Sequence, residues 1–274
     1  MQTEIAQAIA LTIVGNDLLH GQPREDFWPT ATVFAFCKNV TFVSLSGLRT
    51  APIETPFTED PLQWITKLKN EGTLGFRVHH VAVNDPRMSD RMSVGFVGGG
   101  GRWLIESVGN AVSDLWEAGW RVQNQSDPDR KCWDVRYRRV GVDLPHRRPR
   151  ARGLSTLRHE LEDVLSKIED FAYRQKLEAF AKSFRRGIDL LHADAPLASV
   201  YHSDLAPSAR LPLQAKQILG AAQEAWVFGG MGSWNDLGFE GRDQEEYTAL
   251  SDQLFSLLNQ AVCEAANSGF SDSR

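Results

Sequence analysis

In the first half of the chain, apolar and polar positions alternate with the period of two that is typical of half-buried β-strands. The stretch TLGFRVHHVAV, residues 73–83, is the clearest case. The run from Ala31 to Leu45 is rich in Val, Phe and Thr, which favour strands, and the polar Lys38–Asn39 pair is a point where this run could turn as a hairpin. Further strands are predicted at 92–97, 102–108, 120–123 and 132–142, the last two as a hairpin around the turn SDPD.

Three short helices are expected among these strands. The first covers residues 3–14 and ends at Gly15. The second begins at Asp60, which is a favourable N-cap before Pro61, and ends at Gly72. The third covers residues 110–118, where the apolar side chains share one helical face.

Beyond the middle of the chain the apolar period becomes that of a helix. From Ser155 to Leu191, apolar residues recur about every 3.6 positions, with a shift of phase near Tyr173. A second helix is predicted over 213–228. A third is predicted to begin at Asp243, because Glu246 follows three residues later and completes a capping box.

These elements predict an α+β fold, with an N-terminal, mainly antiparallel sheet domain that contains short helices and an all-helical C-terminal domain. We predict the sheet domain over residues 1–145, a basic linker over 146–153 and the helical domain over 154–274. The linker is rich in Pro and Arg, which do not build a hydrophobic core.

Composition narrows the class of protein. The 274 residues are 42% hydrophobic and 24% charged, as in ordinary globular proteins. No apolar run approaches the roughly 18 residues of a membrane span, and the first residues carry Glu4 and lack the basic segment of a secretory signal. Three well-separated cysteines favour a reducing compartment over a disulfide framework or a zinc site. We therefore expect a cytoplasmic protein without a metal or other cofactor.

Charge is distributed unevenly along the chain. Residues 130–152 contain nine Lys and Arg, whereas residues 193–274 contain four bases and eleven acids. We expect a basic binding surface at Arg136, Arg138, Arg147 and Arg148. These arginines could pair with the acidic helical domain, bind an acidic protein partner or bind the phosphates of a nucleic acid. Nucleic-acid binding is the least favoured of the three, because the sheet domain is not basic overall.

The segment AWVFGGMGSWNDLGF, residues 225–239, places two Trp, two Phe and four Gly between predicted helices. Aromatic side chains dominate the energetic hot spots of protein interfaces, and glycines permit close backbone approach. The segment is accordingly a candidate binding loop with Trp226, Trp234, Asn235 and Asp236 as its binding residues. The alternative, which is slightly favoured for Trp226, is that the segment fills the core between domains.

The loop after residue 191 carries two His-x-Asp pairs, His192 with Asp194 and His202 with Asp204. An imidazole near a carboxylate can transfer protons or bind a metal, although surface turns produce the same pattern. Arg186 lies six residues before His192, and this spacing resembles the short motif of HEPN-type ribonucleases, although Gly187 replaces the usual polar neighbour of the arginine. The resemblance implies RNA cleavage by Arg186 and His192.

Two other features have simpler structural explanations. The run Gly98–Gly101 lacks the Lys-Ser/Thr of a phosphate-binding loop and is predicted to be a hairpin turn. His79 and His80 point to opposite faces of a strand, so they cannot share a metal ion; His80 is expected in the core. A small-ligand site near His79 and Arg102 is a third, less supported functional hypothesis.

The sequence contains no nucleophile elbow, zinc-protease motif or dinucleotide fingerprint. We therefore expect a cytosolic protein of bacterial type that binds another protein, as an immunity-like or adaptor component, with an acidic or aromatic-accepting partner surface. The alternative is a hydrolase or ribonuclease whose catalytic residues, in the helical domain, are Arg186, His192, Asp194, His202 and Asp204. Whether the protein is an enzyme is left open by the sequence.

Overall fold

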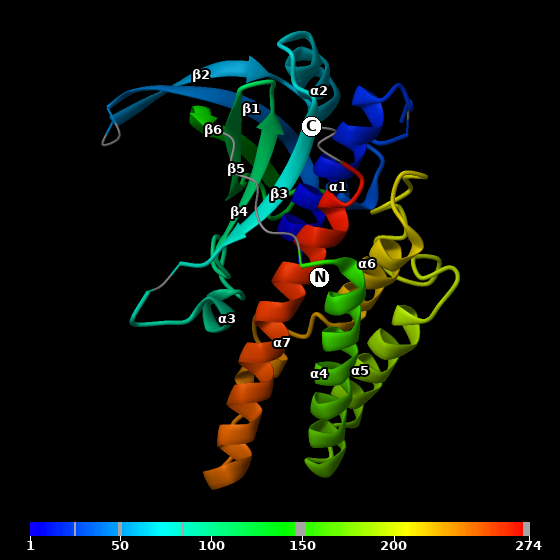
Figure 1. Cartoon of the computed structure of the whole chain (residues 1–274). Coiled ribbons are helices and arrows are strands. Elements are labelled where there is room, and N and C mark those ends of the chain that lie inside the picture. Colours follow the sequence, from blue (N-terminus) through cyan, green and yellow to red (C-terminus); the bar gives the residue numbers. More distant parts are fainter. Residues whose placement is uncertain (25, 49–50, 84, 146–151, 271–274) are drawn as a thin grey trace.

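The computed structural model describes residues 1–24, 26–48, 51–83, 85–145 and 152–270. It confirms the predicted α+β class: a six-stranded sheet in the first half of the chain, then a group of helices in the second (Figure 1). The strands lie in the order β2-β1-β6-β5-β4-β3. Every pairing is antiparallel except that of β1 with β6, so the sheet is mixed but mainly antiparallel. The strands are β1 (Cys37–Leu48), β2 (Ala51–Thr58), β3 (Gly75–Val81), β4 (Arg102–Val108), β5 (Val112–Val122) and β6 (Trp133–Pro145).

The helices divide between the two halves. Helices α1 (Thr3–Leu19), η1 (Thr32–Phe34), α2 (Pro61–Asn70) and α3 (Asp90–Ser93) accompany the sheet. The second half consists of α4 (Leu154–Arg174), α5 (Glu178–Leu191), α6 (Leu213–Ala225), η2 (Trp234–Asp236) and α7 (Gly241–Asn267). The predicted phase shift near Tyr173 is confirmed as the break between α4 and α5.

Several local predictions were wrong. Residues 112–118, predicted as part of a helix over 110–118, belong to strand β5, which pairs with β4 and β6 and places Trp116 against the rings of Phe42, Phe57 and Trp64. Tertiary packing thus overrides the local helical pattern. The segment 92–97 is the end of α3 followed by turns, so Gly98–Gly101 belong to a longer loop and not to a tight hairpin.

Two helix boundaries also differ from the predictions. Helix α1 continues through Gly15, where a Cβ atom would lie 2.6 Å from the ring of Phe76, so the glycine allows close helix–strand packing rather than ending the helix. Helix α7 begins with Gly241 after the N-cap Glu240. The capping box at Asp243 is therefore absent; Asp243 instead accepts a hydrogen bond from Gln175 at 2.9 Å.

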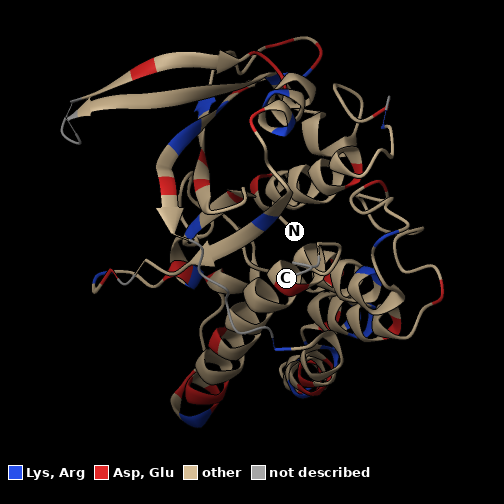
Figure 2. Ribbon diagram, turned by 45° about the horizontal axis from the view of Figure 1, so that its top comes forward, with Lys and Arg blue, Asp and Glu red and all other residues tan. Residues whose placement is uncertain are grey.

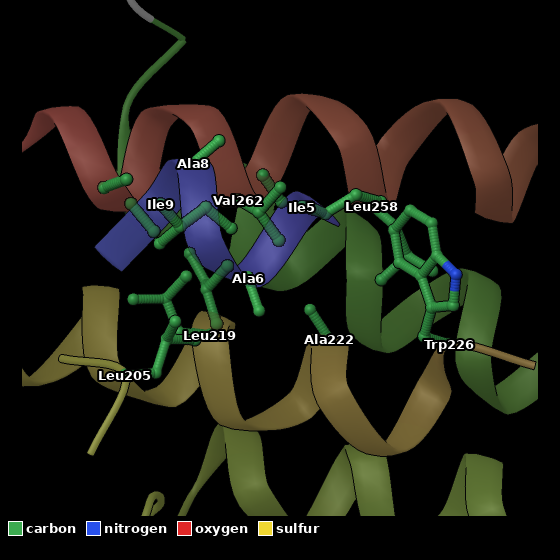
Figure 3. Close-up of a cluster of buried hydrophobic side chains, with 14 of the residues drawn as sticks. Ile5, Ala6, Ala8, Ile9, Leu205, Leu219, Ala222, Trp226, Leu258 and Val262 are labelled. Atoms are coloured by element: carbon green, nitrogen blue, oxygen red, sulfur yellow. The ribbon is translucent and has the colours of Figure 1, made fainter. Parts of the chain in front are cut away.

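Helix α1 is buried on all sides between the sheet and the helices of the second half. Its residues from Ile5 to Asp17 are all buried. Figure 3 shows Ile5, Ala6 and Ile9 between α7 and α6, surrounded by Leu219 and Val262. The buried apolar residues of the sheet and of the C-terminal helices form one hydrophobic cluster, which α1 makes continuous.

The free edge of strand β3 is covered by two asparagine side chains. Asn16 of α1 accepts a hydrogen bond from Phe76 N at 2.8 Å and donates one to Phe76 O at 3.0 Å. Asn267 of α7 does the same at Val78, with distances of 2.8 and 2.9 Å. A carboxamide can pair with both backbone groups at once because it carries a donor and an acceptor side by side. These four bonds attach both helices to an edge that would otherwise be left unpaired.

Substituting Asn16 with Leu is expected to lower the free energy of unfolding by about 2–4 kcal/mol, because the N–H and C=O of Phe76 would remain buried without partners. Urea denaturation of the wild-type and variant proteins measures the difference. The control is Asn70→Leu at the exposed end of α2, which should change stability by less than about 0.5 kcal/mol. Equal stabilities of the wild type and Asn16→Leu would contradict the role of this carboxamide.

Candidate functional site

The two tryptophans of segment 225–239 lie in the core. Trp234 is fully buried, and its indole Nε1 donates to Ser251 Oγ at 2.7 Å. Its backbone oxygen accepts a hydrogen bond from the Tyr247 hydroxyl at 2.6 Å. Trp226 is 8% exposed and packs against Phe255. The indoles of both residues therefore contribute to the packing between α5, α6 and α7 and present almost no surface.

Asn235 and Asp236 have defined contacts within the chain. The Asn235 carboxamide donates to the backbone oxygen of Arg91 at 2.7 Å and accepts from the Arg91 guanidinium at 3.0 Å, which attaches this segment to α3. Asp236 accepts a hydrogen bond from the backbone N–H of Gly232 and so closes the local turn. Asn235 is buried, whereas Asp236 is exposed.

Two of the four predicted basic residues share one carboxylate. Arg136 and Arg138, on β6, contact Glu54 of β2 at 2.7 and 2.6 Å. Hydrogen bonds from Arg138 and then Arg136 lower the pKa of Glu54 below its ordinary value. Both guanidinium side chains stay at least 40% exposed, and Figure 2 shows basic and acidic segments together on the strands of the sheet. Arg147 and Arg148 lie outside the described residues.

The predicted residues at the end of α5 make separate contacts. Arg186 donates to the backbone oxygen of Ser199 at 2.6 Å and lies 3.5 Å from Glu224 of α6. His192 contacts Glu162 of α4 at 2.9 Å. Asp194 is exposed. Because Arg186 and His192 have different partners on different helices, their observed contacts do not form a common catalytic arrangement.

His202 and Asp204 are brought together at Thr32 of η1, where His202 is buried and Thr32 and Asp204 are half-buried. Asp204 accepts hydrogen bonds from the Thr32 backbone N–H at 2.7 Å and from its hydroxyl. The Thr32 hydroxyl has one hydrogen and donates it to Asp204. Nδ1 of His202, which lies 2.8 Å from Thr32 Oγ1, is therefore the donor in the bond between these two atoms. His202 is 2% exposed, and burial lowers its pKa to about 4. These contacts fix the 193–212 loop to the sheet half of the protein.

An exposed apolar surface lies where the loop after α3 meets the loop after α6. Phe96, Val97 and Met231 are 66%, 61% and 101% exposed. The backbones just before Phe96 and Met231 touch: a Cβ atom at Gly95 would lie 2.5 Å from the backbone oxygen of Gly229 and 2.9 Å from Cα of Gly230. We call Phe96, Val97 and Met231 the two-loop patch. The sequence does not predict this patch. Its pattern favours a strand at 92–97, and in segment 225–239 it favours the tryptophans, and not Met231, as binding residues.

A pocket of 330 Å³ lies beside this patch. Phe96 and Val97 line it together with Trp120 and Trp133, whose rings are 5.9 Å apart. The indole Nε1 of Trp120 is buried and has no hydrogen-bond acceptor within the described part of the chain. A buried N–H without a partner costs about 1–3 kcal/mol.

Among the residues that the structure describes, no three His, Cys, Asp or Glu side chains form a cluster suited to a metal ion, and no helix is long and apolar enough to span a membrane. Comparison of the chain with family models, curated proteins and solved structures gives no significant match.

The buried imidazole of His202 makes stability depend on pH. Its pKa is about 4 in the folded protein and near 6.5 in an unfolded chain, so protonation favours unfolding. We expect its contribution, about 3 kcal/mol, to be complete above pH 6.5 and lost as the pH falls towards 4. Denaturant titrations from pH 7 to 4 test this, and His202→Gln should flatten the decline. The exposed His192→Gln serves as the control; a decline unchanged in His202→Gln would contradict the assignment.

Proposed function

We propose that this chain is a cytosolic protein-binding protein, acting as an immunity-like or adaptor component, and that its partner docks on the two-loop patch. The observation that carries the proposal is the exposure of Phe96, Val97 and Met231 at one contact between two loops. Clustered large apolar side chains on a protein surface mark interaction sites, whereas single ones need no explanation. The free thiols of Cys37, Cys132 and Cys263 support a reducing compartment.

The chemistry of the partner follows from the adjoining pocket. Its wall of Trp120 and Trp133 accommodates an apolar or aromatic side chain. The unpaired N–H of Trp120 is closed off from solvent, so a hydrogen-bond acceptor beside that side chain would pair with it only when the indole shifts on binding. We therefore propose a protein partner that inserts an apolar residue next to a backbone carbonyl or a carboxylate.

A second contact is proposed at Arg136 and Arg138. Two half-exposed guanidinium groups share the single carboxylate of Glu54, which leaves one positive charge in excess. An acidic partner surface would find this charge favourable, and raising the salt concentration would weaken that part of the interaction. Arg136 and Arg138 thus supply charge selectivity, and the two-loop patch supplies the larger share of the binding free energy.

The alternative of a hydrolase or ribonuclease remains a prediction. Its residues are divided between a Thr32-centred hydrogen-bond group and separate ion pairs with Glu162 and Glu224. No observation of the described residues favours it over protein binding.

The double variant Phe96→Ser/Met231→Ser is expected to reduce recovery of the partner from host lysate at least tenfold, because it removes the apolar contact area. Quantitative mass spectrometry of tagged pull-downs measures recovery, and titration with the purified partner then gives the affinity. Since both side chains are exposed, the melting temperature should stay within about 2 °C of the wild type.

The matched control for this experiment is Ile53→Ser. Ile53 is 63% exposed on β2 and does not belong to the two-loop patch. It should leave partner recovery unchanged. If the double variant retains the partner, or if Ile53→Ser loses as much, the patch is not the docking site.

A further inference from the structure

A cavity of 680 Å³ lies between the end of β3, the loop that leads into α3, and one face of α7. This volume is within the range of small-molecule sites, about 300–1,000 Å³. Helix α7 contributes Asp252, Phe255, Ser256, Asn259 and Gln260 to its lining. Their spacing of three and four residues places them on one stripe of the helix, with Asn259 near its middle. The cavity shares no lining residue with the two-loop patch.

Asn259 is the unusual residue of this lining. It is 2% exposed, and neither its Oδ1 nor its Nδ2 has a hydrogen-bond partner in the described part of the chain. Buried polar groups are almost always paired, and each unpaired one is costly. Two other asparagines of the long helices, the buried Asn16 and the half-buried Asn267, use both amide atoms. Both amide atoms are closed off from solvent, so Asn259 offers its adjacent donor and acceptor to a molecule in the cavity when its side chain turns towards the lumen.

The walls next to Asn259 favour a flat ligand. The rings of His80 and Phe255 line the cavity, with centroids 6.4 Å apart and planes nearly perpendicular. His80 is held in place by Gly100 O at 2.9 Å and by the ring of Trp103 at 5.0 Å. Burial lowers the pKa of His80, which keeps its imidazole uncharged at neutral pH. Because the two ring planes are nearly perpendicular, a flat ligand can stack on one of them while its edge meets the other.

The charges of the lining disfavour an anion. Three carboxylates, those of Asp85, Asp90 and Asp252, line the cavity with the guanidinium of Arg91, and Asp85 pairs with Arg87 at 2.8 Å, so that Asp90 is left as the excess negative charge. Arg91 is already engaged by Asp252 at 2.6 Å and by Asn235 at 3.0 Å. A phosphate or carboxylate of a ligand would meet more negative than positive charge. An uncharged ligand avoids this repulsion.

We propose that this cavity binds an uncharged planar heterocycle that presents a hydrogen-bond donor beside an acceptor, as the edge of a purine base does, and that Asn259 recognises this edge. Asparagine pairs in this two-bond manner with adenine, whose N6 donates and whose N7 accepts. The inference goes beyond protein binding and does not depend on it, because a different set of residues carries it.

The test is calorimetric titration of the full chain with adenosine, adenine, guanosine and nicotinamide, and with AMP as the anionic comparison. We expect at least one uncharged probe to bind with a dissociation constant below 1 mM, and AMP to bind at least tenfold more weakly than adenosine. Asn259→Leu should weaken binding at least tenfold. Its melting temperature should equal or exceed that of the wild type, because it removes an unpaired polar group.

The control is Gln253→Leu, an amide-to-leucine change at an exposed position of the same helix. It should leave binding unchanged. The proposal is overturned if no uncharged probe binds at millimolar concentration, if AMP binds as tightly as adenosine, or if Asn259→Leu binds like the wild type. A folded Asn259→Leu protein with normal binding would show that the carboxamide is not the recognising group.

Discussion

The arrangement of this protein depends on how the free edge of β3 is covered. Two carboxamides, from Asn16 and Asn267, pair with the backbone at Phe76 and Val78 and so attach one helix from each end of the chain to the sheet. Apolar packing alone would allow a helix to slide along an edge strand, because hydrophobic contacts are non-directional. Paired hydrogen bonds at fixed residues set the register between α1, α7 and β3.

The register between α1, α7 and β3 determines where both proposed binding surfaces lie. Strand β3 ends just before the loop that carries the cavity wall and α3, and α7 presents its Asn259 stripe to the same space. Arg91 on α3 is held by Asp252 of α7 and by Asn235, which connects the cavity to the loop that bears Met231. The two-loop patch and the cavity are consequently supported by neighbouring segments between β3 and β4, residues 95–97 and 85–91, although their linings are separate.

The sequence predicted the elements whose periodicity is strong and left the interactions between distant segments unseen. The strand at 73–83 and the helices of the second half follow directly from apolar spacing. Strand β5 does not follow from apolar spacing, since Val112, Leu115 and Trp116 also share a helical face. Only the pairing of this segment with β4 and β6 decides between a strand and a helix. Asn16 and Asn259 each interrupt an apolar helical run, which is a signal of a buried polar group, but the partner of such a group is set by the tertiary structure. The exposure of Phe96 likewise depends on a loop contact that no local pattern encodes.

Native-state hydrogen exchange of the Phe76 and Val78 amides tests this account most directly. If the carboxamides of Asn16 and Asn267 hold the edge of β3, both amides should exchange only through global unfolding, with a free energy of exchange equal to that of denaturant unfolding. Exchange of either amide through local opening, at a rate typical of a solvent-exposed edge strand, would contradict the account.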